Sequence, residues 1–138
     1  MSADEARRRF AAARVARLAT ADAEGVPHLV PVVFAVEGDL VVVAVDQKPK
    51  RTTALKRLAN VRSNPRVALL ADHYEDDDWD ALWWVRADGV GTVHEPGAPA
   101  AVHAVELLGD RYPQHRAAPP EGPVLAVRVT RWSGWSAR

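Results

Sequence analysis

The stretch that decides the fold runs from Val15 to Val45 and reads VARLATADAEGVPHLVPVVFAVEGDLVVVAV. Turns around Gly25 and Gly38 interrupt a pattern of valine-rich and alternating apolar residues that is typical of strands. The predicted strands are Val15 to Thr20, Pro27 to Val36 and Leu40 to Val45. Because the turns are too short for the crossover helices that parallel strands require, we expect these three strands to run antiparallel.

The rest of the chain predicts three more strands and three helices around this sheet. Strands are expected at 66–71, 82–94 and 124–131, and Gly89 predicts a bulge in the long one. Helices are expected at 4–13, 54–61 and 100–109, with an exposed acidic loop at 72–80, a further loop at 112–123 and a bend at Ser133-Gly134. Six strands with short peripheral helices favour a mainly β fold, a closed or nearly closed antiparallel barrel.

Length and composition restrict the class of protein. The 138 residues predict a single domain, 1–138, and the absence of cysteine excludes disulfides and thiolate chemistry and fits a cytoplasmic location. The longest apolar stretch, 29–36, is far shorter than the roughly 20 residues of a membrane-spanning helix, and no secretion signal is recognisable, so no membrane partner is expected. The five histidines are scattered at spacings that predict no metal site.

Charge is distributed unevenly along the chain. Lys and Arg balance Asp and Glu at 18 each, so no broad cationic surface for nucleic acid is expected. Between Gln47 and Ala71 there is no acid, and the cations are Lys48, Lys50, Arg51, Lys56, Arg57, Arg62 and Arg66. The densest part follows a strand and opens a helix, whose unpaired N–H groups and positive dipole end favour an anion. The pattern predicts a phosphate-binding site; the alternative is a solvated helix whose charges only maintain solubility.

Tryptophan is frequent for so short a chain, with five residues. Trp83 and Trp84 are adjacent in a predicted strand, so their side chains are expected on opposite faces of the sheet. One is expected in the core and the other against a partner or a planar ligand. Trp132 and Trp135 are expected near the end of the barrel, where they either cap it or contact a ring.

Several short motifs, taken in order along the chain, resemble the pyridoxamine 5'-phosphate oxidase-like split-barrel flavoproteins. Within that group the resemblance is to the actinobacterial oxidoreductases that depend on the deazaflavin coenzyme F420. The motifs are Arg17-Leu-Ala-Thr20, Gly25-Val-Pro-His28, Pro31-Val-Val-Phe34, Lys48-Pro-Lys-Arg-Thr52, Asn64-Pro-Arg-Val67, Trp83-Trp-Val-Arg86-Ala-Asp-Gly89 and Arg131-Trp-Ser-Gly-Trp135. Each motif is weakly specific by itself, whereas the ordered set spans nearly the whole chain.

The resemblance implies a six-stranded antiparallel split β-barrel of the FMN-binding type, which forms a homodimer with two cofactor sites between the subunits. The residues that match the phosphate-binding groups of the family are Lys50, Arg51 and Thr52, with Lys48 and Lys56 as helpers. Those that match the strand along which the cofactor ring lies are Pro31, Val32 and Val33. An aromatic side chain of the long fifth strand, Trp84 or Trp83, would approach the ring from the other subunit.

The resemblance also implies an oxidoreductase that transfers a hydride between coenzyme F420 and an unidentified small organic substrate. Two alternatives stay open: an FMN-binding relative with the same phosphate site, and a non-catalytic cofactor carrier or sensor. Lys56, Arg57 and Arg62 favour F420, because its tail is anionic. No catalytic residue is assigned, although Arg86, Tyr74 and Tyr112 are candidates near the groove. Pyridoxamine phosphate is not expected as a substrate, because the sequence ends before the arginine- and histidine-bearing segment that holds it in true oxidases.

Overall fold

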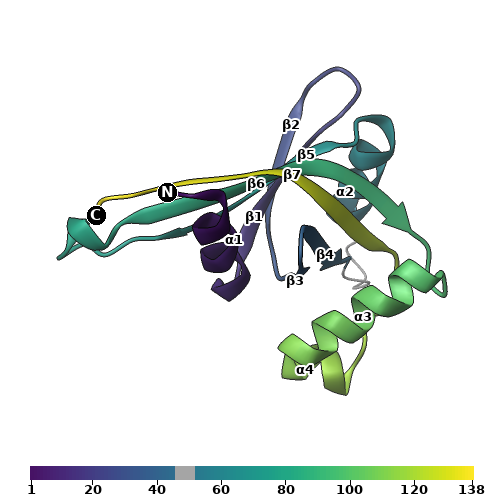
Figure 1. The fold of residues 1–138 in the computed structure, drawn as a ribbon. Helices are drawn as coiled ribbons and strands as arrows, with labels where there is room; N and C mark the ends of the chain where they lie inside the picture. The colour runs from purple at the N-terminus through teal and green to yellow at the C-terminus, as the bar shows by residue number, and fades with distance from the viewer. Residues whose placement is uncertain (46–51) are drawn as a thin grey trace.

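The fold is built on an antiparallel sheet of seven strands, seen in a computed structural model that describes residues 1–45 and 52–138, with only the backbone of 52–55. The strands are β1 (Ala16–Ala21), β2 (Pro27–Val32), β3 (Ala35–Glu37), β4 (Leu40–Ala44), β5 (Arg66–His73), β6 (Trp83–His94) and β7 (Val124–Ser136). They lie in the order β2-β1-β5-β6-β7-β4-β3. The central strands β5, β6 and β7 are the longest, and together they extend away from the body of the protein in Figure 1.

Helices surround the sheet, and local sequence explains where several of them begin. They are α1 (Ala3–Ala12), α2 (Thr52–Ser63), the 3-10 helix η1 (Trp79–Ala81), α3 (Pro99–Arg111) and α4 (Pro113–Ala117). The Ser2 hydroxyl accepts a hydrogen bond from the Glu5 N–H (3.1 Å) and so caps α1. Prolines begin α3 and α4, where a missing N–H costs no hydrogen bond. None of the described helices is long and apolar enough to cross a membrane.

The predicted second strand is in fact two strands, so the sheet has seven strands and two open edges rather than six strands in a nearly closed barrel. The break lies at Phe34, whose fully buried ring packs on Phe10 with centroids 4.6 Å apart. The Phe34 N–H donates to the Tyr112 hydroxyl (3.2 Å), which also lies 2.9 Å from the Phe34 carbonyl oxygen. A side chain 78 residues away therefore replaces a strand partner, which the local alternation does not reveal.

Three other predictions have clear outcomes. The bulge at Gly89 is confirmed: the register of β6 and β7 shifts between Asp88 and Gly89, and a side chain there would overlap the Arg128 carbonyl oxygen. The bend at Ser133-Gly134 is wrong, because β6 supplies hydrogen-bond partners to β7 as far as Ser136. The predicted loop at 112–123 contains α4, which is too short to produce a recognisable periodic pattern.

Alternation along the strands gives the long part of the sheet two different faces. The inner face is buried, and Phe10 of α1 belongs to the same core cluster as Leu18, Leu69 and Val85. A second cluster packs beneath α3 around Leu108. The opposite surface of β2, β1, β5, β6 and the end of β7, called the outer face below, includes Leu29, Pro31, Arg17, Leu70, Trp84, Arg86, Ser133 and Trp135.

An exposed histidine links α3 to the edge strand β3 and makes part of the stability pH-dependent. His103 Nε2 lies 2.8 Å from Glu37 Oε1, and this hydrogen bond, with the Glu37 charge, raises the pKa of His103 above its ordinary value of 6.5. The resulting stabilisation is present below the ordinary pKa and is lost as the pH rises through the raised, folded-state pKa. His103→Gln should therefore lower the free energy of unfolding more at about pH 6 than at about pH 9. Urea unfolding of both proteins tests this, and equal losses would contradict it.

Candidate functional site

Only part of the predicted phosphate site lies in the described residues. Lys48, Lys50 and Arg51 fall outside them, and of Thr52 only the backbone is described, as the first residue of α2. The helix prediction over 54–61 is confirmed, and no acid occurs in the first turn of α2. Lys56 is exposed one turn further along. The beginning of α2 therefore has the positive dipole end and a first turn without acids, which both favour an anion.

The position of α2 relative to the sheet is set by buried contacts. Leu58 and Val61 are buried, and Gly91 of β6 leaves the room that Val61 needs, since a Cβ there would come within 3.0 Å of Val61 Cγ1. Asn60, which is also buried, donates from Nδ2 to Thr20 Oγ1 of β1 (3.1 Å). A buried hydrogen bond of this kind costs most when one partner is removed, so it holds the helix in register with β1.

Two charges of the basic run have acidic neighbours. The hydrogen bond from the Val26 N–H, helped by the Glu24 N–H and the nearby Lys56 charge, holds the pKa of Asp22 below its ordinary range, so Asp22 stays ionised near Lys56. Arg62 forms an ion pair with Glu95 at 2.9 Å. The positive charge that the sequence suggested for an anionic tail is thus partly balanced at these two positions.

The predicted ring-binding residues lie at the end of β2 and have different exposures. Pro31 is exposed on the outer face, and Val33, just after the strand, is 38 % exposed. Val32 is only 6 % exposed, because its side chain belongs to the core beside Leu18 and Phe34. Val32 therefore offers no exposed side chain, whereas Pro31 and Val33 do.

Trp84 lies on the outer face of β6, and Trp83 lies on the inner face, as alternation predicts. Trp83 packs against the core, with the Arg9 guanidinium 5.4 Å from its ring. Trp84 is half-buried, with the Arg86 guanidinium 5.8 Å from its ring. Three strand spacings separate β6 from β2, about 14 Å, so Trp84 does not meet Pro31 of its own chain.

The two C-terminal tryptophans have different surroundings. Trp132 Nε1 donates to Asp39 Oδ1 (2.9 Å), and its ring packs edge-on against Phe10 at 5.4 Å, so its contacts are those of a structural residue. Trp135 stands directly opposite Trp84 in the pairing of β6 and β7 and is 48 % exposed. Trp84 and Trp135 together form an aromatic surface on the outer face.

Polar residues gather beside the Trp84 and Trp135 rings, and the sequence did not predict this grouping. Arg86 Nε donates to Asp88 Oδ2 (2.9 Å), and Ser133 stands opposite Arg86 across the strand pair. The Ser133 hydroxyl is buried and has no hydrogen-bond partner among the described residues. The grouping depends on the register of β6 and β7, which brings together residues more than forty positions apart, so no local motif indicates it.

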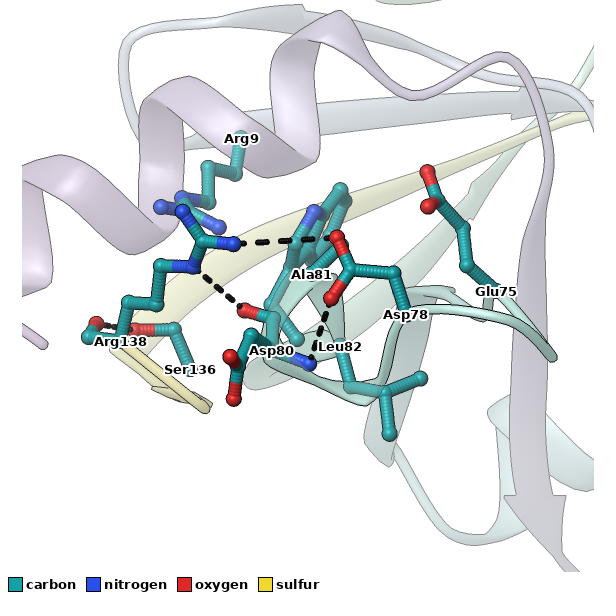
Figure 2. A pocket seen from close by; sticks show the side chains of 9 residues that line it. Arg9, Glu75, Asp78, Asp80, Ala81, Leu82, Ser136 and Arg138 are labelled. Atoms are coloured by element: carbon teal, nitrogen blue, oxygen red, sulfur yellow. Dashed lines mark hydrogen bonds and ion pairs between the residues drawn. The ribbon is translucent and has the colours of Figure 1, made fainter.

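A cavity of about 370 Å³ lies at the far end of the long strands, between α1, the loop after β5 and the end of β7 (Figure 2). Arg138 forms an ion pair with Asp78 (3.7 Å) and donates from Nε to the Asp80 carbonyl oxygen (3.2 Å). Arg9, Glu75 and Trp83 line the same cavity, and among the described residues Trp84, Pro31, Val32 and Val33 do not. Opposite charges face each other across it, so its walls select no particular charge, and we assign it no ligand.

The chain is similar to known proteins over nearly its whole length. The family described as pyridoxamine 5'-phosphate oxidase matches residues 2–136. A comparison with curated proteins finds no match. Among solved structures, the conserved hypothetical protein Rv2991 from Mycobacterium tuberculosis has a TM-score of 0.74 and 24 % identity, over 100 % of this chain and 86 % of that chain.

Two further solved structures are similar and differ in what their names say they bind. The FAD binding protein from Mycobacterium smegmatis has a TM-score of 0.62 and 19 % identity, over 98 % of this chain and 94 % of that chain. HutZ, the heme storage protein from Vibrio cholerae, has a TM-score of 0.68 and 16 % identity, over 99 % of this chain and 95 % of that chain. At these identities the likeness establishes a common split-barrel fold.

Proposed function

Because the chain belongs to the pyridoxamine 5'-phosphate oxidase family, we propose that it is a homodimeric oxidoreductase that binds coenzyme F420 and transfers a hydride between it and a small organic substrate. The observation that carries this proposal is the setting of α2. A helix without acids, preceded in sequence by a run of cations, packs on β1, the neighbour of the edge strand β2. At the other end of the β1–β2 pair, where Arg17 stands opposite Pro31, the end of β2 offers the exposed apolar side chains of Pro31 and Val33.

These residues fit a phosphate-bearing, ring-containing cofactor. Lys48, Lys50, Arg51 and Thr52 would hold the phosphate, with the N–H groups at the start of α2, and Pro31 and Val33 would contact the ring. When bound, the deazaflavin supplies the hydride donor or acceptor, which no side chain can provide. The protein's own part is to bind the cofactor, orient it toward the substrate and exclude water from the ring.

Dimerisation is part of the proposal, and the outer face supports it. Leu29 is 67 % exposed there, and Leu70 and Trp135 are also exposed. Arg17 and Arg86 lie beside Leu70 on the same face, and large apolar side chains exposed among such polar residues favour an interface. The separation of Trp84 from β2 within one chain supports the same arrangement, because only a second copy can bring a Trp84 side chain to the ring. A partner on the outer face would also offer the buried Ser133 hydroxyl a hydrogen bond.

The dimer gives a direct prediction. Light scattering at micromolar concentration should report a particle of about 30 kDa, twice the chain mass of 15.1 kDa. Leu70→Glu places a charge in the proposed interface and should produce a monomer. Val102→Glu is the matched control, because Val102 is exposed on α3, away from the outer face. A monomeric wild-type protein, or a Leu70→Glu variant that stays dimeric, would refute the shared site.

A flavin is the second candidate cofactor. Two similar structures, from Mycobacterium smegmatis and Mesorhizobium loti, are named as FAD-binding proteins. The same phosphate site would serve FMN, and the heme storage protein HutZ supports a third alternative, a carrier without catalysis on the same fold. The substrate in the leading proposal is a conjugated or quinone-like acceptor.

Calorimetric titration of the purified protein with F420 and with FMN tests the proposal directly. We expect F420 to bind at least about tenfold more tightly than FMN. In anaerobic stopped-flow experiments, reduced F420 should reduce a quinone-like acceptor, whereas reduced nicotinamide should not. Tight F420 binding without oxidation across a broad acceptor panel would favour the carrier, and tighter binding of FMN would favour the flavoprotein.

A further inference from the structure

A cavity of about 420 Å³ lies between the ends of α1 and α3 and the edge strand β3. Its polar lining consists of Arg14, Asp110 and Arg111, and its apolar lining consists of Ala11, Ala12, Ala35, Val36 and Leu107. It includes none of the residues assigned to the cofactor. In Figure 1 the end of α3, next to α4, lies toward the lower part of the view, on the same side as β3.

Both arginines are held against one aromatic ring. The guanidinium of Arg14 lies 4.8 Å from the ring centre of Tyr112, and that of Arg111 lies 5.4 Å from it. Arg14 Nη2 donates to the Arg111 carbonyl oxygen (3.3 Å), and Arg111 Nη2 donates to the Ala13 carbonyl oxygen. Tyr112 is itself anchored through its hydroxyl to the Phe34 backbone. The two cations are therefore positioned by the fold rather than free in solution.

The cavity has more positive charge than negative charge. No carboxylate lies within 4.0 Å of the Arg14 or Arg111 guanidinium in the described parts of the chain, although Asp110 lines the same cavity. The carbonyl groups at the ends of α1 and α3 offset part of the charge. Burial lowers the pKa of Arg111, and the nearby Arg14 charge acts in the same direction. A guanidinium group carries five N–H donors, and within the described residues Arg14 and Arg111 each use one of them in a hydrogen bond to protein.

From this arrangement we propose that the cavity binds a small organic monocarboxylate, with its carboxylate on the Arg14 and Arg111 guanidinium groups and its apolar body against Val36, Leu107 and the alanines. Planar guanidinium groups match a carboxylate in two-point hydrogen bonding. An apolar wall of alanine, valine and leucine favours an alkyl or aryl body over a second polar group. Asp110 repels a second negative charge, so inorganic phosphate and dicarboxylates should bind more weakly.

Hexanoate is the probe, titrated into the full-length protein and followed by calorimetry and by amide chemical shifts in NMR spectra. Saturable binding at millimolar or lower concentration is expected, with shifts at α1, β3 and the end of α3. Hexan-1-ol, adipate and inorganic phosphate should each bind at least about tenfold more weakly. Failure of hexanoate to saturate, or equal binding of hexan-1-ol, would overturn the proposal.

Variants assign the binding to these residues. Arg14→Gln should weaken hexanoate at least about tenfold, and its folding is expected to be preserved because Arg14 is exposed. Arg8→Gln, at an exposed position of α1 that does not line the cavity, is the matched control and should bind as the wild type does. Asp110→Asn should reduce the discrimination against adipate.

Wild-type affinity in Arg14→Gln, or equal losses in Arg14→Gln and Arg8→Gln, would refute the site. None of these measurements depends on F420, so their failure is independent of the proposed function.

Discussion

Replacing Lys50 and Arg51 together by alanine is expected to weaken the binding of F420 by about a hundredfold, without lowering the melting temperature. Each side chain would lose a charge-assisted hydrogen bond to the cofactor phosphate, worth about 1.5 kcal/mol at the least, and about 1.4 kcal/mol corresponds to a factor of ten. In the sequence the two residues immediately precede α2, which begins at Thr52, and the N-terminal end of a helix favours an anion. Calorimetric titration measures the change.

The matched control is Arg8→Ala combined with Arg116→Ala. It removes the same number of positive charges from exposed positions on α1 and α4, and we expect the affinity to stay within about twofold of wild type. If both double variants lost affinity equally, the effect would come from overall charge and not from a phosphate site. Unchanged affinity in the Lys50 and Arg51 variant would contradict the site outright.

Phe34→Ala is expected to lower the free energy of unfolding by about 3–5 kcal/mol. The ring is fully buried, packs on Phe10 and has the Arg111 guanidinium 4.8 Å from its centre. Its removal would leave a cavity where β2, β3, α1 and α3 meet, and the surrounding backbone could close only part of it. Urea unfolding, followed by tryptophan fluorescence, measures the loss.

Two further variants separate the ring from the backbone contact. Val33→Ala, at the neighbouring exposed position, should cost less than about 1 kcal/mol. Tyr112→Phe keeps the Tyr112 ring but leaves the Phe34 N–H without its acceptor, and about 1–3 kcal/mol should be lost. A loss in Phe34→Ala no larger than that in Val33→Ala would mean that Phe34 does not anchor the junction of β2 and β3.

Much of the candidate site was predictable because its signals are local. The run of cations, the strand before it and the apolar spacing of residues 54–61 all lie within about twenty-five positions, and the helix forms there. The opposite orientations of Trp83 and Trp84 follow from the two-residue repeat of a strand. The sequence predicts two alternative roles for Trp135, capping the barrel or contacting a ring. It does not decide between them, because the position of Trp135 beside Trp84 depends on the pairing of β7 with β6.

By itself, the sequence determined the antiparallel character of the sheet, the bulge at Gly89 and the presence of α2, since turn length, backbone room and apolar periodicity act between near neighbours. Only the tertiary structure decided that the second strand divides at Phe34, that the sheet stays open, and that Arg14 meets Arg111 against Tyr112. Those outcomes depend on contacts between residues roughly eighty to a hundred positions apart, and such contacts leave no mark on the local pattern of either partner.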